Sequence, residues 1–461
     1  MSQKSAEQKK PKVVLAAVQL PGVSDSEHAS SLDELERLCG TLGFVTVGRV
    51  SQKRPAAANG SVLGEGKLIE LASWTGGTGI IKGYVRPGDE VEDDEGLEEL
   101  YAREAMDEPA VVTPAKAELA IFDCEITPNQ LRNLEEALGV EVLDRSGVIL
   151  EIFSRHARSR EARLQVEIAK LAYLAPRRRA ARTGGDRQGG GIGAKGAGES
   201  SHELDRRRIR DRIAELRHEL DLIQGEQSKR RASRREAPCV ALVGYTNAGK
   251  SSLMRALTHS EVLVENKLFA TLDTTVRALQ PETVPRILVS DTVGFIKKLP
   301  HDLVASFRST LDEALGASLL LFTVDASDPS FRAQLQVTQT VLAEIGADQT
   351  ERVMVMNKID CLTPEQQKLL IEEYPKALFI STRDPRDVQR VREVILQFFE
   401  RDMVEKTVLV PYSQGQLLGK VRERARVVDE IHEDTGTRVT IRAHDEVHAW
   451  FEKQMKQALP S

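Results

Sequence analysis

Aromatic residues are scarce in this chain of 461 residues, at 4% of the total. Modules that bind nucleic acid by stacking bases on aromatic side chains need many of them, so the scarcity argues against that class. Cysteine is also rare, and none of the four cysteines belongs to a CxxC pair, which argues against a zinc site or a disulfide framework. We therefore expect reduced cysteines in a cytoplasmic protein.

Long apolar runs are missing as well. The longest lies around residues 319–324 and is far too short to span a membrane. The N-terminus, MSQKSAEQKKPK, is polar and lacks the apolar core of a signal peptide. These absences predict a cytoplasmic protein without an integral membrane segment.

The charges exclude a uniformly basic coat, because 64 Lys and Arg are outnumbered by 70 Asp and Glu, giving a net charge of −6. A local basic patch is still compatible with that balance. Hydrophobic residues make up 41% of the chain, enough for globular cores. At about 150 residues per domain, the length predicts roughly three domains.

The N-terminal part predicts an α/β domain at 13–153, after a disordered tail at 1–12. Apolar alternation and helical periodicity support this reading. A strongly acidic segment at about 78–108 interrupts the pattern, and we interpret it as a solvated surface insertion. The predicted strands are 13–20, 44–50, 119–123 and 141–143. The predicted helices are 31–42 and 127–138, and a further helix is expected to open at 67–72.

The next segment, 154–236, predicts a helical hairpin. It holds 22 Lys and Arg against 12 Asp and Glu, and two apolar seams recur at three- and four-residue steps, as in helices packed side by side. Between the seams lies a loop rich in Gly and Arg, 176–200. That loop is either a flexible linker with solvating charges or a mobile basic tip that reaches phosphates. Its candidate RNA-contacting residues are Arg177, Arg178, Arg179, Arg182, Arg187 and Lys195.

From 237 to 403, short apolar runs alternate with helix-length segments. This alternation predicts a parallel sheet with crossover helices. After residue 404 the pattern restarts and predicts a small α/β domain at 404–461.

The strongest motif is GYTNAGKS, which follows an apolar strand and precedes a helical segment. In that context the glycines let backbone N–H groups turn inward around phosphates, and the helix N-terminus favours negative charge. Lys250 would reach the β- and γ-phosphates and Ser251 would ligate magnesium. The candidate phosphate-binding residues are Gly244, Tyr245, Thr246, Asn247, Ala248, Gly249, Lys250, Ser251 and Ser252.

A second motif, NKID, follows the apolar run 353–356 and selects the base. A carboxylate at Asp360 can accept hydrogen bonds from the guanine N1–H and exocyclic amine, whereas adenine would leave it unpaired. At this distance after a phosphate loop, the motif predicts binding of GTP and GDP. Its residues are Asn357, Lys358, Ile359 and Asp360.

Three further segments complete the predicted site. In DTVG, Asp291 would hold magnesium through a water and the Gly294 N–H would sense the γ-phosphate. In FATLDTT, one of Thr271, Thr274 and Thr275 would supply another magnesium ligand. After the strand at 377–380, a backbone N–H of STR would touch the guanine oxygen. The candidate residues are Phe269, Ala270, Thr271, Leu272, Asp273, Asp291, Thr292, Val293, Gly294, Ser381, Thr382 and Arg383.

The residue after Gly294 is Phe295, where Ras-like enzymes carry the glutamine that orients the attacking water. Phenylalanine has no polar group for that task, so the catalytic residue is unknown. Asn247 is either a ligand for a monovalent cation such as potassium or a residue that stabilises the loop turn. We predict slow intrinsic turnover that a partner accelerates.

The motifs GYTNAGKS, FATLD and DTVGFIKKLPHDLVASFRSTLDEA resemble those of the HflX-type GTPases, as do GSVLGEGKLIEL and the glycine loop GGIGAKGAGES upstream. The resemblance covers most of residues 55–400. It implies a phosphate-loop GTPase domain with a parallel-rich sheet, preceded by an α/β domain with a helical hairpin. It also places the magnesium threonine within FATLD, at Thr271.

The resemblance further implies association with the large ribosomal subunit and its ribosomal RNA, with some members splitting or rescuing stalled ribosomes under stress. Two other functions stay open: a regulatory GTP switch that binds a protein partner through the N-terminal domain, and a GTPase of ribosome assembly or tRNA modification. DNA is not an expected partner, and we expect a monomer.

Overall fold

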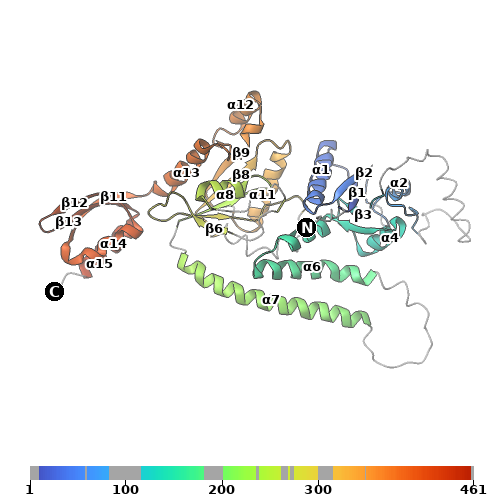
Figure 1. The fold of residues 1–461 in the computed structure, drawn as a ribbon, viewed down its shortest axis with the longest axis horizontal. Coiled ribbons are helices and arrows are strands. Elements are labelled where there is room, and N and C mark those ends of the chain that lie inside the picture. Colours follow the sequence, from blue (N-terminus) through green and yellow to red (C-terminus); the bar gives the residue numbers. More distant parts are fainter. Residues whose placement is uncertain are drawn as a thin grey trace, which may run out of the picture. The chain divides into compact units, whose positions relative to one another are not determined.

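The computed structural model describes residues 10–57, 60–81, 116–180, 201–234, 238–260, 268–269, 275–298, 315–347 and 349–457. They fall into two compact units (Figure 1). Unit 1 comprises the described residues up to Asp221, and unit 2 those from Leu222 onward. Among the described residues, no helix is long and apolar enough to cross a membrane.

Unit 1 is built on a four-stranded parallel sheet with the strand order β2-β1-β3-β4. Each crossover between neighbouring strands contains a helix, as parallel pairing requires. Local signals set the helix starts: α1 and α4 both begin with a capping box. The elements are β1 (Lys12–Gln19), α1 (Asp25–Thr41), β2 (Val45–Lys53), α2 (Glu65–Thr75), β3 (Leu119–Phe122), α4 (Pro128–Leu138), β4 (Glu141–Asp144) and α5 (Arg145–His156).

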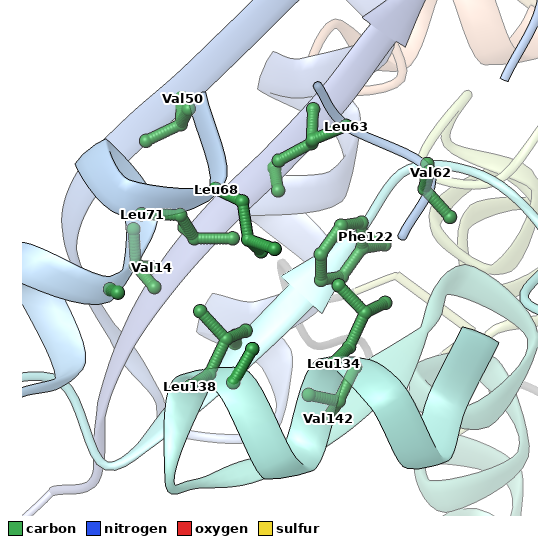
Figure 2. Packing of buried hydrophobic residues seen from close by; sticks show 14 of the residues in the cluster. Val14, Val50, Val62, Leu63, Leu68, Leu71, Phe122, Leu134, Leu138 and Val142 are labelled. Atoms are coloured by element: carbon green, nitrogen blue, oxygen red, sulfur yellow. The ribbon is translucent and has the colours of Figure 1, made fainter. Parts of the chain in front are cut away.

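One hydrophobic core of unit 1 lies between this sheet and the helices α2 and α4 (Figure 2). Phe122 from β3 is fully buried among side chains of both helices, which explains why apolar residues recur on one face of each. The core also takes in Ile81, from the start of the segment predicted to be an acidic insertion. Residues 82–108 of that segment lie outside the described residues.

Two long helices follow, α6 (Arg160–Ala180) and α7 (Ser201–Arg234). Ion pairs at 3.0 Å link them, from Arg160 to Glu219 and from Arg212 to Glu167, and Leu216 of the predicted apolar seam is fully buried. Helix α6 extends to Ala180, past the start expected for the glycine-rich loop at 176. The rest of that loop, 181–200, lies outside the described residues.

Unit 2 holds a six-stranded sheet with the order β10-β9-β8-β5-β7-β6, parallel except for the β6–β7 pair. This confirms the predicted α/β fold with a parallel-rich sheet. The antiparallel edge strand β6 was not predicted. The strands are β5 (Cys239–Val243), β6 (Thr275–Ala278), β7 (Leu288–Asp291), β8 (Leu319–Asp325), β9 (Arg352–Asn357) and β10 (Leu378–Phe379), and the helices are α8 (Lys250–Thr258), α11 (Phe331–Glu344), α12 (Pro364–Glu373) and α13 (Pro385–Glu400).

The end of the chain forms a three-stranded antiparallel sheet with the order β11-β13-β12. Apolar residues of the sheet, among them Val410 and Val439, form a separate core with residues of two helices, among them Phe451. This is the small C-terminal α/β fold expected from the sequence. The elements are β11 (Val404–Pro411), α14 (Gly415–Arg424), β12 (Arg426–Glu433), β13 (Gly436–Ala443) and α15 (Asp445–Gln457).

Candidate nucleotide-binding site

The four predicted motifs of unit 2 that the structure describes follow strands of one sheet. GYTNAGKS follows β5, DTVG begins on the last residue of β7, NKID begins on the last residue of β9, and the 381–383 loop follows β10. These strands run parallel, so their carboxyl ends lie at the same edge of the sheet. That edge is where open α/β sheets bind their ligands.

The phosphate loop needs its glycines for two physical reasons. Gly244 has φ +150°, and a Cβ there would lie 2.1 Å from the carbonyl oxygen of Thr323. Gly249 has φ +96°, and its Cβ would lie 2.2 Å from Asn357 Nδ2. Only glycine combines these backbone angles with such close neighbours. The loop ends where α8 begins, at Lys250, so the helix N-terminus faces the loop.

Lys250 is buried beneath this loop. Its Nζ donates to the carbonyl oxygens of Gly244 at 3.0 Å and of Tyr245 at 2.9 Å. Burial lowers the pKa of Lys250 to about 8, against the opposing effect of Asp291. The hydrogen-bond acceptors of this buried ammonium group are neutral carbonyls, and its pKa stays lowered despite Asp291, so an anionic ligand such as a phosphate would stabilise its charged form.

Beside Lys250, the side chains of Ser251 and Asp291 place two oxygen atoms that can ligate a metal ion close together. Ser251 Oγ donates to Asp291 Oδ2 at 2.7 Å, and Asp291 is fully buried at the end of β7. The neighbouring Thr292 hydroxyl donates to the Leu242 carbonyl at 2.7 Å, which joins this turn to β5. A hydroxyl and a carboxylate suit a hard cation such as Mg²⁺, so these residues fit that ion.

The DTVG turn contacts the phosphate loop directly. The Thr246 N–H donates to the Phe295 carbonyl at 2.8 Å, and the Phe295 N–H donates to the Gly244 carbonyl at 3.1 Å. The Phe295 residue is 3% exposed. The position of the usual water-orienting glutamine is therefore occupied by a buried apolar ring.

On the base side, Asn357 connects three loops. Its fully buried side chain donates through Nδ2 to the Ala248 carbonyl at 2.8 Å and accepts the Thr382 N–H at 3.2 Å through Oδ1. Asp360 is partly exposed, and the Arg383 guanidinium donates to its Oδ2 at 3.3 Å. The predicted phosphate and guanine segments are thus tied together through one amide.

Sequence reasoning missed Asp325, the last residue of β8. Its carboxylate pairs with Lys358 Nζ at 2.6 Å and so holds the NKID lysine in place. The available signal was weak: a carboxylate at the carboxyl end of a largely apolar, buried strand, next to the predicted ligand edge.

The structure describes only some of the other predicted site residues. Phe269 is buried with φ +57°, whereas Ala270, Thr271, Leu272 and Asp273 lie outside the described residues. The same holds for Arg182, Arg187 and Lys195, and for the side chains of Arg178 and Arg179. Arg177 is described, and its guanidinium is used within unit 1. It pairs with Asp144, donates to the Ile126 carbonyl at 3.1 Å and lies 3.5 Å from the centroid of the Tyr173 ring.

Three family models match the chain: "GTP-binding GTPase N-terminal" at 102–154, "GTP-binding GTPase Middle Region" at 156–234 and "50S ribosome-binding GTPase" at 239–358. The chain is 55% identical to the GTPase HflX of Gluconacetobacter diazotrophicus, over 94% of this chain and 95% of that protein. It is 36% identical to the one from Caldanaerobacter subterraneus, over 93% and 90%, and 33% identical to the one from Escherichia coli, over 90% and 89%.

Proposed function

Because the chain belongs to the HflX family of GTPases, we propose that it uses the GTP cycle of unit 2 to control binding to the large ribosomal subunit. The observation that carries the nucleotide part is the buried Lys250 ammonium beside the Ser251–Asp291 pair. The description of one matching family model, a 50S ribosome-binding GTPase, supports the ribosomal part.

In this proposal the phosphate-loop N–H groups and Lys250 bind the β- and γ-phosphates. Ser251 and Thr271 would ligate Mg²⁺, and Asp291 would hold it through a water. The ion would neutralise charge on the phosphate oxygens. Asp360 reads the guanine edge, and the backbone of the 381–383 loop contacts the guanine oxygen.

Catalysis lacks a side chain that orients water at Phe295. The Gly294 N–H senses the γ-phosphate, and Asn247, with φ +62° on the phosphate loop, is the candidate ligand for potassium. Intrinsic hydrolysis should therefore be slow and should accelerate on a partner. Turnover measured with and without large subunits, in potassium and in sodium, tests this; equal rates in all four conditions would contradict it.

The proposed partner is the ribosomal RNA of the large subunit, contacted by the basic hairpin, and the proposed outcome is the splitting or rescue of stalled ribosomes under stress in the cytoplasm. The physical support is the excess of Lys and Arg in 154–236 within an acidic chain. Because RNA binding releases counterions, it should weaken steeply as salt rises. A switch that binds a protein partner through unit 1 should respond less.

The deciding experiment is sedimentation of the full chain with purified large subunits and a non-hydrolysable GTP analogue, over a series of salt concentrations. We expect co-sedimentation that the analogue strengthens and that added salt reverses. The Lys250→Ala variant should lose the dependence on nucleotide. Absence of co-sedimentation at moderate salt would remove the ribosomal function while leaving GTP binding intact.

A further inference from the structure

We propose that the Tyr245 hydroxyl is a latch that holds the segment 294–297 against the phosphate loop, and thereby weakens binding of GTP relative to GDP. This inference rests on the phosphate-loop assignment made above. It gives the Tyr245 side chain a part in distinguishing GTP from GDP, in addition to the γ-phosphate contacts proposed above for Lys250 and the Gly294 N–H.

The first observation is a hydrogen bond between two segments that are distant in the sequence. The Lys297 N–H donates to the Tyr245 hydroxyl oxygen at 2.6 Å. Tyr245 is 4% exposed, so its ring is held by packing and its hydroxyl is well positioned. The bond lies next to the two backbone hydrogen bonds that join Phe295 to Gly244 and Thr246.

The second observation is the closeness of Gly294 to Lys250. A Cβ on Gly294 would lie 2.9 Å from Lys250 Nζ and 2.8 Å from Thr246 Cα. The turn is therefore in contact with the ammonium group that would bind the β- and γ-phosphates. In that direction there is no room for a phosphoryl group between Gly294 and Lys250.

It follows that a γ-phosphate needs the 294–297 segment to move, whereas GDP, which lacks this phosphate, does not. Every hydrogen bond that holds the segment in place then acts against GTP and is neutral toward GDP. In the described part of the chain three such bonds are visible, and two of them join backbone groups on both sides. The Tyr245 hydroxyl is the one side-chain group among the three.

The size of the effect follows from a single hydrogen bond. The net value of such a bond corresponds to about threefold to tenfold in an equilibrium constant. Tyr245→Phe keeps the buried ring and removes only the oxygen. Lys297 is partly exposed, so water can satisfy its N–H after the change.

The test compares Tyr245→Phe with wild type and with Tyr412→Phe. The control loses the same group, because the Tyr412 hydroxyl donates to the Glu433 carbonyl at 2.8 Å in the C-terminal sheet, away from the nucleotide motifs. Calorimetry with Mg²⁺ gives the affinities of each protein for GDP and for a non-hydrolysable GTP analogue. We expect the ratio of analogue affinity to GDP affinity to rise about threefold to tenfold in Tyr245→Phe. It should stay unchanged in Tyr412→Phe.

An unchanged ratio would overturn the latch, and a lowered ratio would show that the hydroxyl supports the GTP-bound form instead. A wild-type protein that binds neither nucleotide, or whose binding survives Lys250→Ala, would instead refute the site assignment. Amide hydrogen exchange on wild type provides a second measurement if the variant folds poorly. The 294–298 backbone should exchange more slowly with GDP than with the analogue, and the reverse order would also overturn the proposal.

Discussion

Changing Asn357 to Asp alters one atom at the point where the phosphate and guanine segments meet. The side chain is fully buried, and its Nδ2 donates to the Ala248 carbonyl at 2.8 Å while its Oδ1 accepts the Thr382 N–H at 3.2 Å. In Asn357→Asp the shape and the acceptor remain. The donor becomes an oxygen that faces the Ala248 carbonyl oxygen.

Two costs add up at neutral pH. Leaving a buried carbonyl without its donor costs about 1–3 kcal/mol. Burial also raises the pKa of the new carboxyl above its unfolded value of about 3.9, and a rise to about 6 would cost roughly 3 kcal/mol more. We therefore expect a loss of about 4–6 kcal/mol, which is a large part of the stability of an ordinary domain.

The sign of the pH dependence follows from that raised pKa. Below about pH 4 the carboxyl is protonated in both folded and unfolded states, and its O–H can donate to the Ala248 carbonyl. As pH rises, the unfolded state ionises first, so the variant loses stability relative to wild type. The loss is complete above the pKa of the folded state.

The assay is urea unfolding and GDP calorimetry at pH 5.5 and pH 7.5, each compared with wild type at the same pH. GDP affinity should fall at least about tenfold at pH 7.5 and recover in part at pH 5.5. As control, Asn133→Asp removes a donor to the Gly60 carbonyl at 3.0 Å in unit 1 and should leave GDP affinity unchanged. Wild-type unfolding and GDP affinity at pH 7.5 in Asn357→Asp would refute the reasoning.

Three further outcomes are expected. Asp144→Ala removes a buried carboxylate that accepts the Gly147 N–H at 2.8 Å and pairs with Arg177. Urea unfolding should therefore show that unit 1 loses about 3–5 kcal/mol of its free energy of unfolding. A loss below about 1 kcal/mol would contradict this. Burial raises the pKa of Cys39 to about 12 while Cys361 is exposed, so mass spectrometry after alkylation at pH 8 should find Cys361 modified first and Cys39 protected until urea is added. Asp360→Asn should lower the affinity for GDP and reduce the preference for GDP over xanthosine diphosphate in competition binding. An unaltered preference would show that Asp360 takes no part in base recognition.

Much of unit 2 was predictable because its signals are local. Most of its strands are short apolar runs, and the phosphate loop lies between β5 and α8 in consecutive residues. Once the strands are taken as parallel, their carboxyl ends must share an edge, so the phosphate, DTVG and NKID segments converge without further information. The edge strand β6 escaped prediction because its sequence, TVRA, is not an apolar run and the strand is only partly buried.

Contacts between residues distant in the sequence were not predictable. Asn357 reaches Ala248 and Thr382, and Lys358 reaches Asp325, from positions that carry no matching local pattern. The sequence indicates that a polar residue ends a strand. Which neighbour it contacts depends on strand order and on side-chain direction, and both are properties of the assembled sheet.

Arg177 shows how such unpredicted contacts affect an argument that counts basic residues. Counting basic residues places it among those that could contact RNA, yet its guanidinium pairs with Asp144, a residue 33 positions earlier. Arg160 and Arg212 are likewise paired, with Glu219 and Glu167. Counterion release depends on the phosphates a protein neutralises, so cations already paired inside the protein add little to it. The salt dependence of ribosome binding should therefore follow the net charge of the hairpin rather than its number of arginines and lysines.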